Sequence, residues 1–239
     1  MDDIIVFGKS QQEHDSRLHT VLSCLSSSGI TLNSAKCEFS KNCLIFLGHV
    51  IDPQGISPDP SKTTAISQMD TPKSVPELRR FLGMVNQLGK FSPNIAELSH
   101  PLRELLSIKR TWSWGPAQAE AFSKLKQELI SPHILTFYDQ AADTIVSADA
   151  SSHGLGAVLL QKVGSQWHPV AYASRSLTDT EARYAQIEKE ALASTWACEK
   201  FTPYIQGKLS HLKLIISHLF PYLATKILTV YHREYCAFA

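Results

Sequence analysis

The sequence has few of the features that mark secreted, disulfide-bonded or membrane proteins. Its five cysteines are odd in number and form no CxxC pair, which argues against a disulfide framework and a zinc site. Acidic residues follow Met1, where a secretory signal peptide would carry basic ones. The longest apolar stretch, 212–224, is interrupted by lysine, serine, histidine and proline, too polar for a membrane span. We therefore expect an intracellular protein, cytoplasmic or nuclear, with no membrane partner.

The chain also lacks a strong net charge, but its charge is unevenly distributed. A formal charge of +1 over 239 residues gives no support for nucleic-acid binding. The segment 71–111, however, holds seven basic residues and three acidic ones. Such a patch can bind phosphate even in a neutral protein, although a solvated helix face explains it equally well.

Apolar spacing in the first 130 residues predicts short strands followed by helices. The β-branched run 4–7 predicts a strand, and 30–56 predicts a sheet edge with a hairpin. Two capping boxes are expected. Ser10 with Glu13 opens a helix that ends at Gly29, and Ser74 with Glu77 opens another. Further helices are predicted at 95–106 and 117–129.

The second half changes to strands and one long helix. Three antiparallel strands are predicted from Thr144 into Asp149, at 157–160 and at 167–174. Thr178 with Glu181 predicts a third capping box that opens the long helix. We expect its buried side to carry Tyr184, Ile187, Ala191, Leu192, Trp196 and Phe201. The fold class is therefore α+β.

Two sets of carboxylates are candidates for chemistry. Asp2 and Asp3 are adjacent at a predicted turn, where their oxygens suit a hard divalent cation, though a solvated chain end is the plainer explanation. Asp149 ends the strand of the second part, and Glu190 lies within the long helix. A strand carboxylate facing a helix carboxylate begins the site of a two-metal phosphodiester hydrolase. Spacing alone does not separate Glu190 from Glu188, and both could be surface acids.

Ordered motifs from residue 1 to about residue 208 resemble gypsy-type LTR retrotransposon polyproteins. Residues 1–7 resemble the Tyr-x-Asp-Asp box of reverse transcriptases without its tyrosine, and 46–51 resemble the primer grip. Segment 78–94 is similar to the thumb. The runs 148–159 and 169–175 look like the opening of the ribonuclease H domain, and 184–193 like its catalytic helix.

The resemblance implies an α+β fold with a partial reverse transcriptase palm and helical thumb, followed by an incomplete ribonuclease H-like domain. The expected divisions are 1–58 for the end of the palm, 59–139 for thumb and connection, and 140–208 for the ribonuclease H-like part. A divergent tail occupies 209–239.

The same resemblance implies the site residues. Asp2 and Asp3 match two of three palm aspartates, and Asp149 and Glu190 match the first two ribonuclease H carboxylates, which favours Glu190 over Glu188. All four would bind Mg²⁺, and the nucleic-acid partners would be template–primer and RNA–DNA hybrid. The expected nucleic-acid-binding residues are Phe46, Leu47, Gly48, His49, Arg79, Arg80, Lys90 and Arg103.

The family pattern breaks after Lys208. The family continues with a Thr-Asp-His box whose aspartate completes the metal site, but residues 201–239 contain no aspartate. Codons for Phe-Glu-Thr-Asp-His read in a shifted frame give Leu-Lys-Leu-Ile, the sequence at 212–215. A frameshift near Lys208 is therefore our hypothesis. A transcript that confirms 209–239, with no other frame restoring the box, would contradict it.

These departures predict a chain with little activity of its own. The third palm aspartate and the fingers would lie before residue 1, and the later ribonuclease H carboxylates are missing. The tail is not expected to replace the missing strands, which leaves the sheet with an exposed edge. The alternatives are a non-catalytic nucleic-acid-binding module that uses the basic thumb with Lys109, or an inert fragment.

Overall fold

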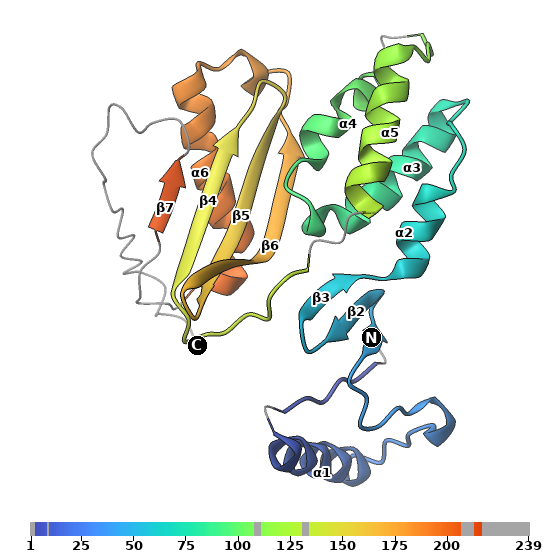
Figure 1. Cartoon of the computed structure of the whole chain (residues 1–239), viewed down its shortest axis with the longest axis vertical. Coiled ribbons are helices and arrows are strands. Elements are labelled where there is room, and N and C mark those ends of the chain that lie inside the picture. Colours follow the sequence, from blue (N-terminus) through green and yellow to red (C-terminus); the bar gives the residue numbers. More distant parts are fainter. Residues whose placement is uncertain (1–2, 9, 108–110, 131–133, 207–212, 217–239) are drawn as a thin grey trace.

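The structure is a computed structural model that describes residues 3–8, 10–107, 111–130, 134–206 and the backbone of 213–216. It contains a three-stranded sheet, a group of helices and a four-stranded sheet with a long helix (Figure 1). The predicted α+β class is thus confirmed. No helix among these residues is long and apolar enough to cross a lipid bilayer.

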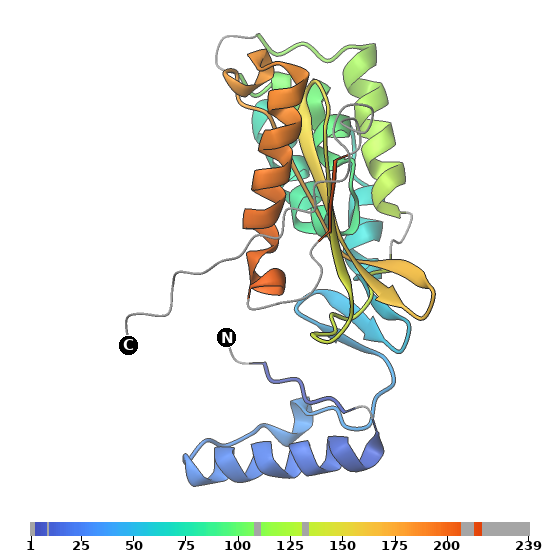
Figure 2. The same cartoon turned by 90° about the vertical axis from the view of Figure 1, so that its left-hand side faces the viewer.

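The first helix, α1 (Gln11–Ser27), lies apart from the other helices at one end of the molecule (Figures 1 and 2). Ser10 is its N-cap and accepts a hydrogen bond from the backbone N–H of Glu13 at 3.2 Å. Gly29 follows with a φ of +69°, as expected at a helix end. None of the helix residues is buried, so local contacts hold this element.

The predicted strand at 4–7 is wrong. Residues 3–8 form no strand, and the side chains of Ile4 and Phe7 are 56% and 69% exposed. A β-strand needs a neighbouring backbone to satisfy its N–H and C=O groups. The described chain brings no such neighbour to this segment.

The hairpin prediction for 30–56 is confirmed by a small antiparallel sheet. A short 3₁₀ turn, η1 (Ser34–Lys36), precedes β1 (Leu44–Phe46), β2 (His49–Asp52) and β3 (Gly55–Pro58). Asp52 caps the second turn by accepting from the backbone N–H groups of Gln54 and Gly55. A bridge between Ile56 and Leu135 then joins this sheet to the linker that leads into the larger one.

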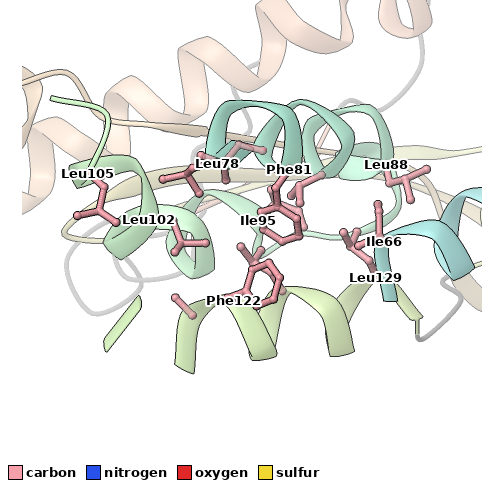
Figure 3. Close-up of a cluster of buried hydrophobic side chains, with 13 residues drawn as sticks. Ile66, Leu78, Phe81, Leu88, Ile95, Leu102, Leu105, Phe122 and Leu129 are labelled. Carbon is pink, nitrogen blue, oxygen red and sulfur yellow. The ribbon is translucent and has the colours of Figure 1, made fainter. Parts of the chain in front are cut away.

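The helical unit comprises α2 (Pro60–Ser67), α3 (Val75–Leu88), η2 (Gly89–Phe91), α4 (Ile95–Glu104) and α5 (Pro116–Ile130). Its helices pack around one apolar core (Figure 3). In that core the rings of Phe81 and Phe122 lie 4.6 Å apart. The core residues are Ile66, Leu78, Phe81, Leu82, Val85, Leu88, Ile95, Leu102, Leu105, Ala121, Phe122, Leu125 and Leu129.

The second capping box forms only in part. Ser74 is the N-cap of α3, but its side chain makes no capping hydrogen bond. The Glu77 carboxylate accepts instead from the backbone N–H of Lys73 at 2.8 Å. A carboxylate in the first turn still favours the helix N-terminus, so the helix begins where predicted without the reciprocal bond.

The larger sheet has the order β6-β5-β4-β7. Its members are β4 (Thr144–Ala150), β5 (Gly154–Val163), β6 (Gln166–Ser176) and β7 (Lys213–Ile216). The first three strands are antiparallel and confirm the prediction, while β7 pairs parallel with β4. The expectation that the tail leaves the sheet edge open is therefore wrong. Pairing uses backbone groups, and a Leu-Ile-Ile run has high β-propensity.

Helix α6 (Gln186–Ile205) covers one face of this sheet (Figure 2). The capping box at Thr178 and Glu181 does form, but it opens the 3₁₀ turn η3 (Glu181–Arg183) rather than α6. Ala185 is the N-cap of α6, and its backbone N–H donates a hydrogen bond to the Glu188 carboxylate at 2.8 Å.

The predicted buried side of this helix is wrong in part. Tyr184 and Ile187 are 41% and 59% exposed, and Ala191 is also exposed, whereas Phe201 is buried. The buried residues of α6 are Lys189, Glu190, Ala193, Ser194, Ala197 and Phe201. The small side chains of Ala193 and Ala197 allow α6 to pack closely on the sheet. The buried face of the helix therefore does not coincide with the face that carries its largest apolar side chains.

Candidate functional site

The hairpin between β1 and β2 carries four of the predicted nucleic-acid-binding residues. Phe46 and His49 are opposite each other, and Leu47 with Gly48 forms the two-residue turn. Both turn residues have positive φ, +50° and +75°, as a type I′ hairpin requires. Leu47 is not glycine and is half exposed at the tip. The turn therefore exposes an apolar side chain at the tip of the hairpin.

Two lysines gather around this turn. The Lys62 Nζ from α2 occupies the space that a β-carbon on Gly48 would need. Lys90 in η2 lies 5.3 Å from the ring of Phe91, and that ring lies 5.5 Å from His49. Burial, followed by the charges of Lys90 and Lys62, lowers the pKa of His49. Sequence reasoning missed Lys62, because nothing in its local pattern indicates that α2 turns back onto the hairpin.

The remaining predicted basic residues have different surroundings. Arg79 and Arg80 are exposed on α3, as a phosphate contact requires. Arg103 donates instead from Nη2 to Asn86 Oδ1 at 2.8 Å and from Nε to Ser99 Oγ at 2.9 Å. This arginine thus ties α4 to α3, and burial lowers its pKa. Lys109 lies outside the described residues.

Asp149 lies near the end of β4 and is exposed. The side chains of neighbouring Ala148 and Ala150 belong to the core that includes α6, so strand alternation directs Asp149 to the other face. There it lines a cavity of about 160 Å³. The opposite wall is formed by the start of α4, including Asn94 and Glu97. Sequence reasoning did not foresee this wall, because it comes from the helical unit.

Glu190 approaches the same end of β4 from α6, and its side chain is 1% exposed. Gln186 donates to Glu190 Oε1 at 3.0 Å and to the backbone carbonyl of Ala150 at 2.9 Å. Glu188 is exposed and caps the helix at Ala185. The two glutamates that spacing could not separate therefore have different surroundings: one is buried beside the sheet, and the other supports the helix start.

The structure describes one of the two aspartates that were predicted to belong to the palm. Asp2 lies outside the described residues, and Asp3 is exposed in a segment without secondary structure. Within the described parts of the chain, no group of three or more histidine, cysteine, aspartate or glutamate side chains could hold a metal ion. Carboxylate oxygens suit Mg²⁺ in kind, but these carboxylates do not fit a complete two-metal site in number.

Comparison with protein families finds two matches in chain order. A family described as reverse transcriptase (RNA-dependent DNA polymerase) matches residues 1–51. Another, described as an RNase H-like domain found in reverse transcriptase, matches residues 114–214. The first covers the hairpin, and the second covers α5, the larger sheet and α6.

Curated relatives include the Transposon Tf2-3 and Tf2-7 polyproteins of Schizosaccharomyces pombe. They are 35% and 34% identical to this chain over 219 residues, which is 91% of its length. The chain spans 16% of the length of each of these relatives. The similarity therefore covers the hairpin, the helical unit and the sheet within one segment of a longer polyprotein.

Solved structures show the same fold. The foamy viral protease-reverse transcriptase dRH in complex with double-stranded DNA matches with a TM-score of 0.75 and 24% identity, over 87% of this chain and 36% of that one. The foamy viral protease-reverse transcriptase in complex with RNA/DNA hybrid matches with a TM-score of 0.74 and 22% identity, over 87% and 28%. The solved structures share the fold, and the two family matches in chain order with the Tf2 relatives show that the chain belongs to the reverse transcriptase–ribonuclease H region of LTR-retrotransposon polyproteins.

Proposed function

We propose that this chain is the nucleic-acid-handling segment of a retroelement RNA-directed DNA polymerase and ribonuclease H, and that its partners are template–primer and RNA–DNA hybrid. The proposed divisions are 1–58 for the palm end, 59–139 for thumb and connection, 140–208 for the ribonuclease H-like part, and 209–239 for the divergent tail. Identity of 35% to Tf2 polyproteins across 91% of the chain carries this proposal.

The geometry supports binding more strongly than it supports catalysis. Basic side chains lie on the helical unit and beside the hairpin, and those of Arg79 and Arg80 are exposed. Exposed guanidinium groups contact backbone phosphates at little desolvation cost. In this proposal Phe46–His49 positions the strand, and Arg103 acts by holding α4 against α3.

Hydrolysis by this chain is proposed to be absent or very weak. Asp149 and Glu190 are the two carboxylates assigned to the ribonuclease H site, and residues 201–239 supply no aspartate. A two-metal hydrolysis needs ions that clamp both the attacking and the leaving oxygen. Asp149 and Glu190 approach the end of β4 from different sides, and two carboxylates alone provide too few ligands for two metal ions.

Cleavage of a labelled RNA–DNA hybrid by the purified chain with magnesium tests the hydrolysis proposal. The expected result is no cleavage from the wild type, and none from Asp149→Asn or Glu190→Gln. Cleavage by the wild type that is lost in Glu190→Gln would show that the tail completes the site, and would overturn the proposed inactivity. Cleavage that persists in both variants would indicate a contaminating nuclease.

The second candidate function is a non-catalytic nucleic-acid-binding remnant, and the seven basic residues of segment 71–111 favour it. Phosphate contacts make log K fall linearly with log salt, by about 0.9 for each phosphate neutralised on B-form DNA. A duplex titration at several salt concentrations therefore separates a binding remnant from an inert fragment. Arg79→Gln with Arg80→Gln should weaken binding and reduce that slope, whereas an inert fragment shows no binding to lose.

A further inference from the structure

The β1–β2 hairpin is bordered by two cations from different elements. Lys62 comes from α2 and places its Nζ against Gly48, where a β-carbon would collide with it. Lys90 comes from η2 and lies over Phe91, whose ring centroid is 5.5 Å from that of His49. Glycine at position 48 thus gives the turn its positive φ and also leaves space for the ammonium.

Nearby negative charge does not neutralise this pair. Within the described residues, neither Lys62 nor Lys90 has a carboxylate within 4 Å. Asp59 interacts electrostatically with Lys62 and His49, but its carboxylate caps α2 by accepting from the backbone N–H of Ser61 at 2.8 Å. Burial and the charge of Lys62 lower the pKa of Lys90, so the two ammoniums repel each other and an anion between them would relieve that repulsion.

We propose that Lys62 and Lys90 share one backbone phosphate of the nucleic-acid strand that lies along the Leu47–Gly48 turn. This inference rests on the proposed function and adds a residue, Lys62, that neither the motifs nor the comparisons assign. A phosphate has oxygens enough for both ammoniums, and each lysine can rotate to reach it. The His49 ring lies beside them, and because the charges of both lysines lower its pKa, that pKa reports on the charge of the site.

The test compares the salt dependence of duplex binding for the full chain and its variants. Lys62→Met and Lys90→Met keep much of the aliphatic stem and remove the charge, and exposed Lys200→Met on α6 is the matched control. If one phosphate is shared, each single variant leaves it neutralised and changes the slope by less than about 0.3. The slope for the double variant should be smaller by about 0.9, so a fourfold rise in salt should weaken its duplex binding by a factor about 3.5 smaller than for the wild type.

Two results in this titration would overturn the inference. Losses of about 0.9 in each single variant and about 1.8 in the double variant would mean two separate phosphates. An unchanged slope in the double variant, matching Lys200→Met, would mean that neither lysine contacts the strand.

An NMR titration of His49 with inorganic phosphate separates failure of this inference from failure of the proposed function. An anion held by the lysines should raise the pKa of His49, in the wild type and not in the double variant. That rise without any duplex binding would support the phosphate site and overturn the nucleic-acid function. No rise, with duplex binding intact, would support the function and overturn the shared site.

Discussion

The N-terminal region (residues 3–8 and 10–46) and the helical unit (residues 60–107 and 111–130) are stabilised by different contacts. Helix α1 has apolar residues at helical spacing, yet it buries none of them. Helix α3 has a similar pattern and buries five, including Phe81 and Val85. Apolar spacing therefore predicts that a helix forms, while its burial depends on which other elements the chain brings against it.

The largest expected effect of a single substitution lies in the core of the helical unit. Phe81→Ala removes a fully buried ring that packs on Phe122, and we expect a loss of about 3–5 kcal/mol in the free energy of unfolding. Leu22→Ala in α1 is the matched change, because Leu22 is 39% exposed. It should cost less than about 0.5 kcal/mol. Urea unfolding measures both, and equal losses would contradict the difference between the two regions.

A buried polar residue gives the next effect, in the larger sheet. Gln161 is 1% exposed and bonds the backbone N–H and C=O of Asp139 at 2.8 Å and the Thr144 hydroxyl at 2.9 Å. Gln161→Leu removes all three bonds, and we expect a cost of about 2–3 kcal/mol because buried polar groups lose their partner. Lys162→Gln, a substitution at the exposed neighbouring residue, is the control. Equal free energies of unfolding for the two variants would show that the hydrogen bonds of Gln161 to Asp139 and Thr144 do not stabilise the fold.

A partly exposed ion pair should have a smaller, pH-dependent effect. Arg175 donates to both carboxylate oxygens of Glu181, at 2.8 and 3.0 Å. This pair, together with the backbone N–H of Thr178, lowers the pKa of Glu181 from 4.5 to about 2. A lowered carboxyl pKa gives stability that is fully present above pH 4.5 and is lost as the pH falls toward 2.

Glu181→Gln removes that ionisable group. Above pH 4.5 the variant should be about 1 kcal/mol less stable than the wild type. The gap should narrow steadily as the pH is lowered from 4.5 to 3. Chemical denaturation at each pH measures it, and a gap that does not change with pH would assign the effect to packing rather than charge.

Local chemistry in the sequence predicted the strands and helices well, because turn residues, caps and apolar period are short-range signals. The failures at residues 4–7 and at β7 both concern strand pairing, which depends on a backbone from elsewhere. The prediction of the buried side of α6 was wrong in part for a related reason. Close packing on the sheet selects Ala193 and Ala197 over the larger Tyr184 and Ile187.

The candidate site likewise has a part that the sequence predicts and a part that it does not. Motifs in the sequence identify Asp149, Glu190 and the hairpin as candidate site residues. The cavity wall from Glu97 and the approach of Lys62 to Gly48 were not, since both arise where distant elements meet.

The smallest expected effects lie at two helix N-caps with the same sequence pattern. Ser10 accepts from the Glu13 N–H, whereas Ser74 makes no side-chain capping bond. Ser10→Ala should therefore cost about 1 kcal/mol, and Ser74→Ala should cost clearly less. Because α1 buries nothing, the loss at Ser10 should appear as faster amide hydrogen exchange within α1, while the midpoint of global unfolding stays unchanged. A shifted midpoint in Ser10→Ala would mean that α1 unfolds together with the helical unit, and the two regions would then be one cooperative structure.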